Sequence, residues 1–178
     1  MKQQFGLVHI YFGNGKGKTS SAVGQVIRSL GYDASVFVAR FLKTKEWISG
    51  EVLFLEKQKN CKIISSELAD PFFYSGNRKV SEQEVGDAQK KIFQTVLSEM
   101  ADGYDIVLLD EILNTVPNYL SEIDILKLLR NKPKKTELIL TGRPCPERIL
   151  EKGDYVTEMK EIRHPFQQNI SARKGIDF

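Results

Sequence analysis

The sequence predicts an α/β fold, with a mostly parallel central sheet of about six strands and helices on both faces. Short β-rich runs alternate with longer helical patterns, which is typical of βαβ units. A glycine-rich stretch also stands between the first apolar run and the first helical pattern, the setting of a phosphate-binding loop. The chain has 178 residues, of which 41% are hydrophobic. We therefore expect one nucleotide-binding domain spanning residues 1–178.

The predicted elements follow from hydrophobic spacing and from end signals. One helix is predicted from Lys18 to Leu30, with Gly31 as a residue beyond its end that tolerates the left-handed conformation. A second runs from Ser81 to Met100, because apolar residues recur at spacings of three and four, and Ser81 with Glu84 matches a capping box. A third covers Asp124–Arg130, before Pro133. The predicted strands are residues 5–12, 34–41, 62–65, 105–110, 136–141 and 155–158.

Composition excludes several classes of function. The chain has 26 basic and 23 acidic residues, a net charge of +3, which leaves no broad basic footprint for nucleic acid. Cys61 and Cys145 are the only cysteines, too few for a disulfide framework, and this favours a reducing cytoplasm. The short apolar run near the N-terminus lacks a cleavage pattern and is far below a membrane span of about 20 residues. We expect a soluble protein.

The stretch FGNGKGKTSSAVG predicts a phosphate loop from Gly13 to Thr19. Glycines let consecutive backbone N–H groups face one anion, and the following helix directs its positive end to the same place. Lys18 would add a charge on the phosphates, and the Thr19 hydroxyl would ligate Mg²⁺. The spacing departs from GxxxxGK[ST], because Phe12 stands where the first glycine belongs and the glycine is displaced to Gly13. The loop path should therefore differ from that of a common NTPase.

The run YDIVLLDEI predicts a buried strand that ends in Asp110 and Glu111. In a parallel sheet this brings a carboxylate to the same edge as the phosphate loop, where it can hold Mg²⁺ directly or through water. Because adjacent strand residues point to opposite faces, we expect only one of the two to reach the metal directly. The sequence leaves open which one.

These motifs together resemble the ATP:corrinoid adenosyltransferases, which have a RecA-like P-loop NTPase fold. The resemblance lies in GNGKGKTS, in the LLDE strand, in LTGRP and in the ending GDYVTEMKEIRHPFQQNISARKGIDF, and it covers nearly the whole chain. It implies transfer of the 5′-deoxyadenosyl group of ATP to Co(I) of a reduced corrinoid, with release of triphosphate. The corrinoid supplies the nucleophile, which agrees with the absence of a Ser/His/Asp or Cys/His set in a chain with two histidines.

The resemblance also implies roles for particular residues. Lys18 and Glu111 would act at the leaving triphosphate, with Mg²⁺ held by Thr19, Asp110 and Glu111. Phe72 and Phe73 would form, with Tyr74, an apolar lid over the corrinoid, although this segment reads DPFFYSGN where relatives have roughly GFTW. The residues expected at ATP or the corrinoid are Gly13, Asn14, Gly15, Lys16, Gly17, Lys18, Thr19, Ser20, Arg28, Tyr74, Arg143 and His164.

Two alternatives stay open from the sequence. A P-loop kinase or NTPase of small-molecule metabolism would share the loop and Asp110 but transfer the terminal phosphoryl group. A non-catalytic ATP-binding or corrinoid-binding module would keep the loop without turnover. The resemblance favours the adenosyltransferase, and with it a homodimer and a flavoprotein that supplies the reducing electron. Neither nucleic acid nor membrane is expected as a partner.

Overall fold

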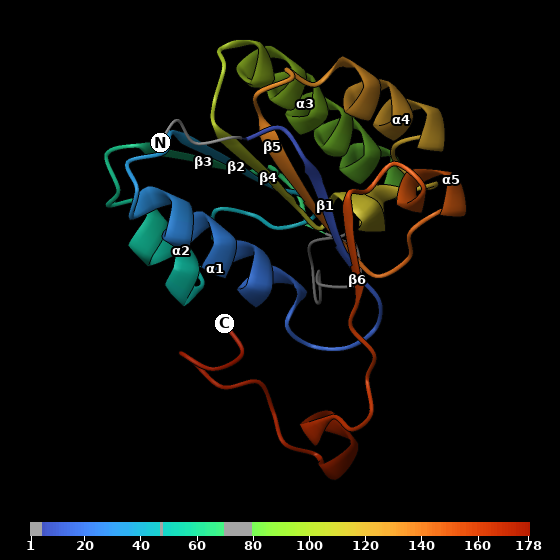
Figure 1. The fold of residues 1–178 in the computed structure, drawn as a ribbon. Coiled ribbons are helices and arrows are strands. Elements are labelled where there is room, and N and C mark those ends of the chain that lie inside the picture. The colour runs from blue at the N-terminus through green and yellow to red at the C-terminus, as the bar shows by residue number, and fades with distance from the viewer. Residues whose placement is uncertain (1–4, 47, 70–79) are drawn as a thin grey trace.

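The computed structural model describes residues 5–46, 48–69 and 80–178. Within these residues six strands form one sheet in the order β3-β2-β4-β5-β1-β6, and every neighbouring pair is parallel (Figure 1). The predicted α/β class with a parallel sheet is therefore confirmed. The strands are β1 (Val8–Phe12), β2 (Val36–Arg40), β3 (Cys61–Ser65), β4 (Ile106–Asp110), β5 (Glu137–Thr141) and β6 (Tyr155–Glu158).

The predicted helices are present, and the structure adds shorter ones. The first helix has the predicted bounds, and the Ser81 capping box is formed at the start of the longest helix. Gly31 was predicted to be left-handed and is not, since its φ is −62°; the chain turns through Asp33, with φ 59°. The α-helices are α1 (Lys18–Leu30), α2 (Gly50–Leu55), α3 (Glu82–Ala101), α4 (Glu122–Asn131) and α5 (Glu147–Leu150), and the 3₁₀ helices are η2 (Ile112–Thr115) and η3 (Pro165–Gln168).

Helices cover both faces of the sheet because both faces of its inner strands are apolar (Figure 1). Successive strand residues point to opposite faces, so Phe37 and Ala39 join the core beneath α3 and α4, whereas Val36 and Val38 join the core beneath α1. All five residues of β2, β4 and β5 are buried. These three strands form a rigid frame, and the loops that leave their carboxyl ends are held at one edge.

The edge strand β6 differs from this frame, because all four of its residues are exposed. After β6 the chain continues as a C-terminal tail, residues 163–178, which leaves the sheet and turns back toward α1 (Figure 1). One sheet runs through the described residues, and the single-domain organisation of residues 1–178 stays a prediction. Among these residues no helix is both long and apolar enough to cross a membrane.

Candidate active site

The phosphate loop begins where β1 ends. Phe12 is the last residue of β1, and it packs against the core beneath α3. Gly13 makes the first bend with φ 102°, and a Cβ there would lie 2.6 Å from the carbonyl oxygen of Met159. At Gly15 a Cβ would meet the same oxygen at 2.8 Å. The displaced glycine of the motif is therefore explained: Phe12 belongs to the strand, and the loop passes under the segment that follows β6.

Backbone hydrogen bonds hold the loop against two neighbouring segments. The N–H of Gly13 donates to the carbonyl of Arg143, at 3.1 Å, and the N–H of Gly15 donates to that of Met159, at 2.6 Å. Gly17 precedes α1 in the left-handed region, with φ 115°. Asn14 and Lys16 are exposed on the loop, and Ser20 is exposed on the first turn of α1.

Lys18 folds back over the loop. Its Nζ donates to the carbonyl oxygen of Gly15 at 2.7 Å, so the ammonium lies against the glycine turn. Burial lowers the pKa of Lys18, and the nearby Arg143 guanidinium lowers it further. Two cationic groups therefore face the same loop. This concentration of positive charge is suited to a polyphosphate.

Lys16 contacts the end of the chain. Its ammonium donates to the carbonyl oxygen of Ile176 at 2.9 Å and pairs with the carboxylate of Asp177. Asp177 also accepts from the backbone N–H and from Nε of Arg173, at 2.9 and 3.2 Å. The C-terminal tail is thereby closed into a turn and held on the phosphate loop.

Thr19 and Asp110 meet directly at the carboxyl edge of the sheet. The Thr19 hydroxyl donates to Asp110 Oδ1 at 2.8 Å, and the Thr141 hydroxyl donates to the same oxygen at 2.8 Å. Thr141 ends β5, which lies between β1 and β4. The intervening strand therefore fixes the distance between the phosphate loop and the acidic strand.

Glu111 follows β4 in the left-handed conformation, with φ 61°, and its N–H donates to the Thr141 hydroxyl at 2.8 Å. This bend turns the Glu111 carboxylate toward that of Asp110, and both carboxylates contact Lys43. The distances from Lys43 Nζ are 2.8 Å to Asp110 Oδ2 and 3.2 Å to Glu111 Oε1. Strand alternation predicted opposite faces for the two acids, and this is wrong because Glu111 lies outside the strand.

The pKa values of the acidic pair, Asp110 and Glu111, are shifted in opposite directions. Burial alone would raise the pKa of Asp110, but the Lys43 charge and hydrogen bonds from Lys43, Thr141 and Thr19 outweigh it and lower that pKa. Burial raises the pKa of Glu111, and the negative charge of Asp110 raises it further, whereas the positive charge of Lys43 lowers it. The two carboxylates in turn raise the pKa of Lys43 although burial opposes this. Asp110 is therefore the firmly ionised member of the pair.

Comparison with known proteins agrees with this geometry. The model of the family "ATP:corrinoid adenosyltransferase BtuR/CobO/CobP" matches residues 4–178. The chain belongs to this family.

Curated relatives agree with the family assignment over nearly full length. The "Corrinoid adenosyltransferase" of Escherichia coli (strain K12) is 32% identical over 175 residues, which are 97% of this chain and 86% of the relative. The "Corrinoid adenosyltransferase CobA" of Salmonella typhimurium is 30% identical over 179 residues, which are 99% and 88% of the two chains. A third such enzyme, from Pseudomonas aeruginosa, is 29% identical over 178 residues.

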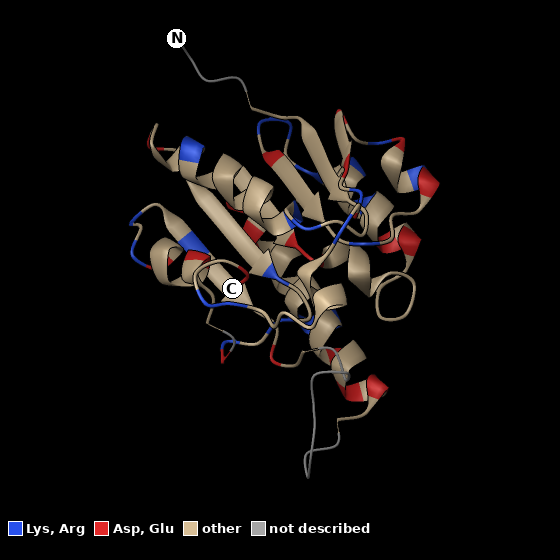
Figure 2. Cartoon of the chain, turned by 90° about the horizontal axis from the view of Figure 1, so that it is seen from below, with Lys and Arg blue, Asp and Glu red and all other residues tan. Residues whose placement is uncertain are grey.

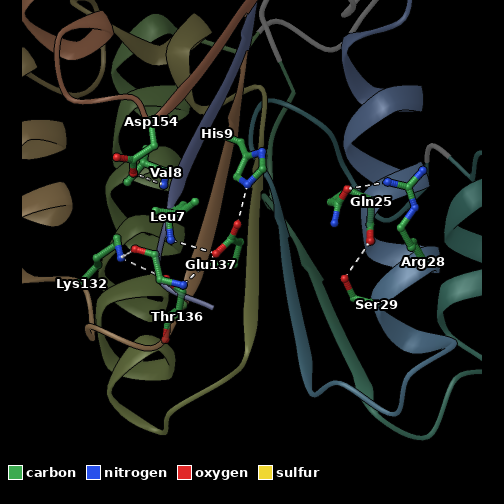
Figure 3. Close-up of polar contacts among 11 residues, drawn as sticks. Leu7, Val8, His9, Gln25, Arg28, Ser29, Lys132, Thr136, Glu137 and Asp154 are labelled. Carbon is green, nitrogen blue, oxygen red and sulfur yellow. Dashed lines mark hydrogen bonds and ion pairs between the residues drawn. The ribbon is translucent and has the colours of Figure 1, made fainter. Parts of the chain in front are cut away.

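In this family member, Arg143 lies at the site, whereas Arg28 and His164 hydrogen-bond to neighbours in their own segments. Arg143 follows β5, and its N–H donates to Asn114 Oδ1 at 2.6 Å. Arg28 lies in the last turn of α1, about 15 Å along the helix from Lys18, and its Nη1 donates to Gln25 at 3.4 Å (Figure 3). His164 precedes η3, and its Nδ1 accepts from the N–H of Phe166 at 3.2 Å.

His9 is a buried structural histidine rather than a site residue. Its Nε2 lies 2.6 Å from Glu137 Oε1, and its ring stacks on Tyr155 at a centroid distance of 4.6 Å (Figure 3). Both partners lie toward the amino ends of the strands, away from the phosphate loop. Phe72, Phe73 and Tyr74 lie outside the described residues, so their role in an apolar lid stays a sequence prediction.

Lys43 is the site residue that sequence reasoning missed. It follows β2 by three residues, and β2 pairs with β4 so that Arg40 lies opposite Asp110. A basic residue just after the strand adjacent to the acidic strand was the available signal. Lys43 belongs to no recognised motif. Its contact with the acidic strand could not be inferred from the sequence, because the order of strands in the sheet was unknown.

Charge is otherwise mixed over this end of the molecule. Seen from below, basic and acidic positions are interspersed among the loops (Figure 2). This distribution agrees with the near balance of 26 basic and 23 acidic residues. The positive charge of the site is therefore local to the phosphate loop and its neighbours, as expected for a small anionic ligand.

Proposed function

We propose that the site binds ATP with its triphosphate on the phosphate loop and transfers the 5′-deoxyadenosyl group to Co(I) of a reduced corrinoid. The single observation that carries this is the convergence of Lys18, Thr19 and the acidic pair at one edge of the sheet, in a chain of the ATP:corrinoid adenosyltransferase family. Backbone N–H groups and Lys18 would neutralise the leaving triphosphate, with Lys16 and Arg143 adding charge.

The chemistry requires little from protein acids or bases. Cobalt supplies the electron pair that forms the bond to the 5′ carbon, the bond from that carbon to the triphosphate oxygen breaks, and the triphosphate leaves with the electrons of that bond. Within the described residues, His9 is occupied by Glu137 far from the loop. Orientation of ATP and stabilisation of the leaving group are then the main tasks of the chain.

The oxygen atoms at the site fit Mg²⁺. Thr19 Oγ1, Asp110 and Glu111 are hard oxygen donors of the kind that this cation prefers. The described residues contain no cluster of three or more His, Cys, Asp or Glu side chains that could hold a metal. We propose that Thr19 and the acidic pair hold Mg²⁺ jointly with the phosphates and water. Bound there, the cation would supply charge neutralisation on the triphosphate.

Further features of the proposal come from the family resemblance. We propose a homodimer, a flavoprotein as the source of the reducing electron, and a cytoplasmic location. The aromatic segment with Phe72, Phe73 and Tyr74 would exclude a lower axial ligand from cobalt, which favours its reduction.

The test is a turnover assay with product identification. The protein is incubated with Mg-ATP and chemically reduced cobalamin, the corrinoid spectrum is followed, and the phosphate product is identified. We expect a cobalt–carbon bond and one triphosphate for each corrinoid converted, and a strong loss of rate when EDTA removes the divalent metal. ADP with a phosphorylated acceptor would contradict the proposal and indicate a kinase. Binding of both substrates without either product would indicate a non-catalytic module.

A further inference from the structure

Lys43 occupies the position between the two carboxylates that are proposed to hold Mg²⁺. Its Nζ lies 2.8 Å from Asp110 and 3.2 Å from Glu111. The side chains of Lys43 and Asp110 are 17% and 3% exposed, so the contact is shielded from bulk water. Two adjacent carboxylates with no cation between them would repel, which identifies Lys43 as their counter-charge.

The backbone that carries Lys43 is held in place by buried groups. Leu42 is left-handed, with φ 54°, a conformation that a bulky residue adopts only when its surroundings hold it there. Its N–H donates at 3.0 Å to Oε1 of Gln89, which is fully buried in α3. The amide of Gln89 donates in turn to the Ser66 hydroxyl at 2.8 Å. The lysine is therefore directed into the site by its anchored backbone, while its four-carbon side chain keeps rotational freedom.

We propose that Lys43 is the resident counter-cation of the acidic pair and competes with Mg²⁺ for its oxygens; this rests on the proposed metal site. Magnesium binds oxygen at about 2.0–2.1 Å, so a cation bound to Asp110 Oδ2 and Glu111 Oε1 would lie close to the Lys43 ammonium on the same oxygens, and the two positive charges would repel. Metal entry therefore requires that the lysine swing away. In the absence of nucleotide the lysine keeps Asp110 and Glu111 assembled and weakens their affinity for free metal.

Lys43 is thus a positioning residue, and it makes metal binding depend on ATP. The phosphates of ATP bring additional oxygen ligands, and these compensate for the loss of the lysine contact. Without ATP, the metal has to displace an ammonium that already makes two charged hydrogen bonds. The consequence is that removal of the lysine should expose a metal site that the wild-type chain conceals.

The test measures Mn²⁺ binding by electron paramagnetic resonance, with neither ATP nor corrinoid present. We expect Lys43→Met to bind Mn²⁺ at least about tenfold more tightly than wild type, because the competing cation is gone. Lys62→Met is the matched control, since Lys62 pairs with Glu99 at 2.7 Å elsewhere on the surface and should leave Mn²⁺ affinity unchanged. Equal or weaker binding by Lys43→Met overturns the proposal.

A second measurement covers the case in which Lys43→Met does not fold. Wild-type protein is acetylated briefly at increasing Mn²⁺ occupancy, and modification of each lysine is quantified by mass spectrometry. We expect acetylation of Lys43 to rise with occupancy while that of Lys62 stays constant. Constant acetylation of Lys43 overturns the proposal. Because neither measurement uses ATP, failure of adenosyl transfer would be recognised separately in the turnover assay.

Discussion

Lys18 illustrates how a charged side chain is kept near an anion site before the anion binds. Its ammonium donates to the carbonyl of Gly15 in its own loop, 2.7 Å away, and burial together with Arg143 lowers its pKa. The lowered pKa means that the protonated form is less favoured here than in water. An anionic triphosphate would restore that preference, since an opposite charge stabilises the charged form.

We therefore expect Lys18→Met to reduce the rate of adenosyl transfer by about a hundredfold or more, as when one preorganised donor to a developing charge is lost. Lys57→Met, an exposed change just after α2, should retain activity. Transfer rates and ATP affinity by calorimetry check this. Equal rates for the two variants would mean that Lys18 does not act on the leaving group.

The two cysteines should be unreactive in the folded chain. Burial raises the pKa of Cys61 to about 11 and that of Cys145 to about 12. The thiolate is the reactive form, so at pH 8 only on the order of one molecule in a thousand carries a Cys61 thiolate, and fewer a Cys145 thiolate. We expect alkylation by iodoacetamide to be slow at pH 8, faster toward pH 11, and rapid after unfolding. Mass spectrometry of labelled protein measures this, and fast labelling of native protein at pH 8 would contradict it.

Residues illustrate what sequence can and cannot predict about the site. Thr19 and Asp110 were predicted because each belongs to a local motif, and the structure brings them to 2.8 Å. Lys43 was missed because its contact with the acidic pair depends on which strands are neighbours in the sheet. The conformation of Glu111 was mispredicted for a related reason, since its φ of 61° is stabilised by Thr141 from another strand.

At the level of elements, helix starts were predictable where a capping pattern was recognised. The box of Ser81 and Glu84 fixes the start of α3. The start of α4 was predicted two residues late, because Asp124 was taken as the first helical residue. It is instead the residue whose carboxylate caps back onto Ser121, completing a second capping box. A Ser followed three residues later by Asp was the overlooked signal.

The position of the C-terminal tail could not be predicted from the sequence. The hydrogen bond from Lys16 lowers the pKa of Asp177 to about 2, so this carboxylate is ionised at any physiological pH. On the proposed binding of the triphosphate, it would compete with phosphate oxygens for the Lys16 ammonium. The ARKGIDF ending, which supported the family resemblance, thus has a structural contact with the phosphate loop.

We expect Asp177→Asn to tighten binding of triphosphate by less than about fivefold, the range of an exposed ion pair, because Lys16 is freed. The effect should vanish in a Lys16→Met background, which makes a double-mutant cycle the matched control. Titration calorimetry with inorganic triphosphate measures both. Weaker binding by Asp177→Asn would instead mean that the tail holds Lys16 in its productive position.

On the scale of the whole molecule, the two ends of the sheet have different tasks. The site lies at the carboxyl ends of β1, β2, β4 and β5. Toward the amino ends, the carboxylate of Glu137 accepts N–H groups of Gly6 and Leu7 at 2.7 and 2.8 Å and contacts His9 (Figure 3). These bonds tie the entrance of β1 to β5. The fold class was predictable from the alternation of strand and helix patterns. The placement of the site at one end of the sheet and of the Glu137 contacts at the other could be inferred only from the strand order.

Glu137→Ala should therefore lower the free energy of unfolding by roughly 1–3 kcal/mol, because the N–H groups of Gly6 and Leu7 and the buried His9 ring lose their partner. Binding of ATP to the folded fraction should be unchanged. The exposed Glu151→Ala is the control, and it should alter stability by less than about 0.5 kcal/mol. Urea unfolding measures both, and an effect of Glu137→Ala on ATP affinity at constant stability would contradict the division.

The contact between Lys16 and the tail also has a practical consequence for handling the protein. A purification tag fused after Phe178 would begin two residues beyond Asp177, which contacts the phosphate loop. It would add foreign charge where nucleotide affinity is measured. The start of β1 lies at the other end of the sheet, so a tag placed before it would leave the loop untouched.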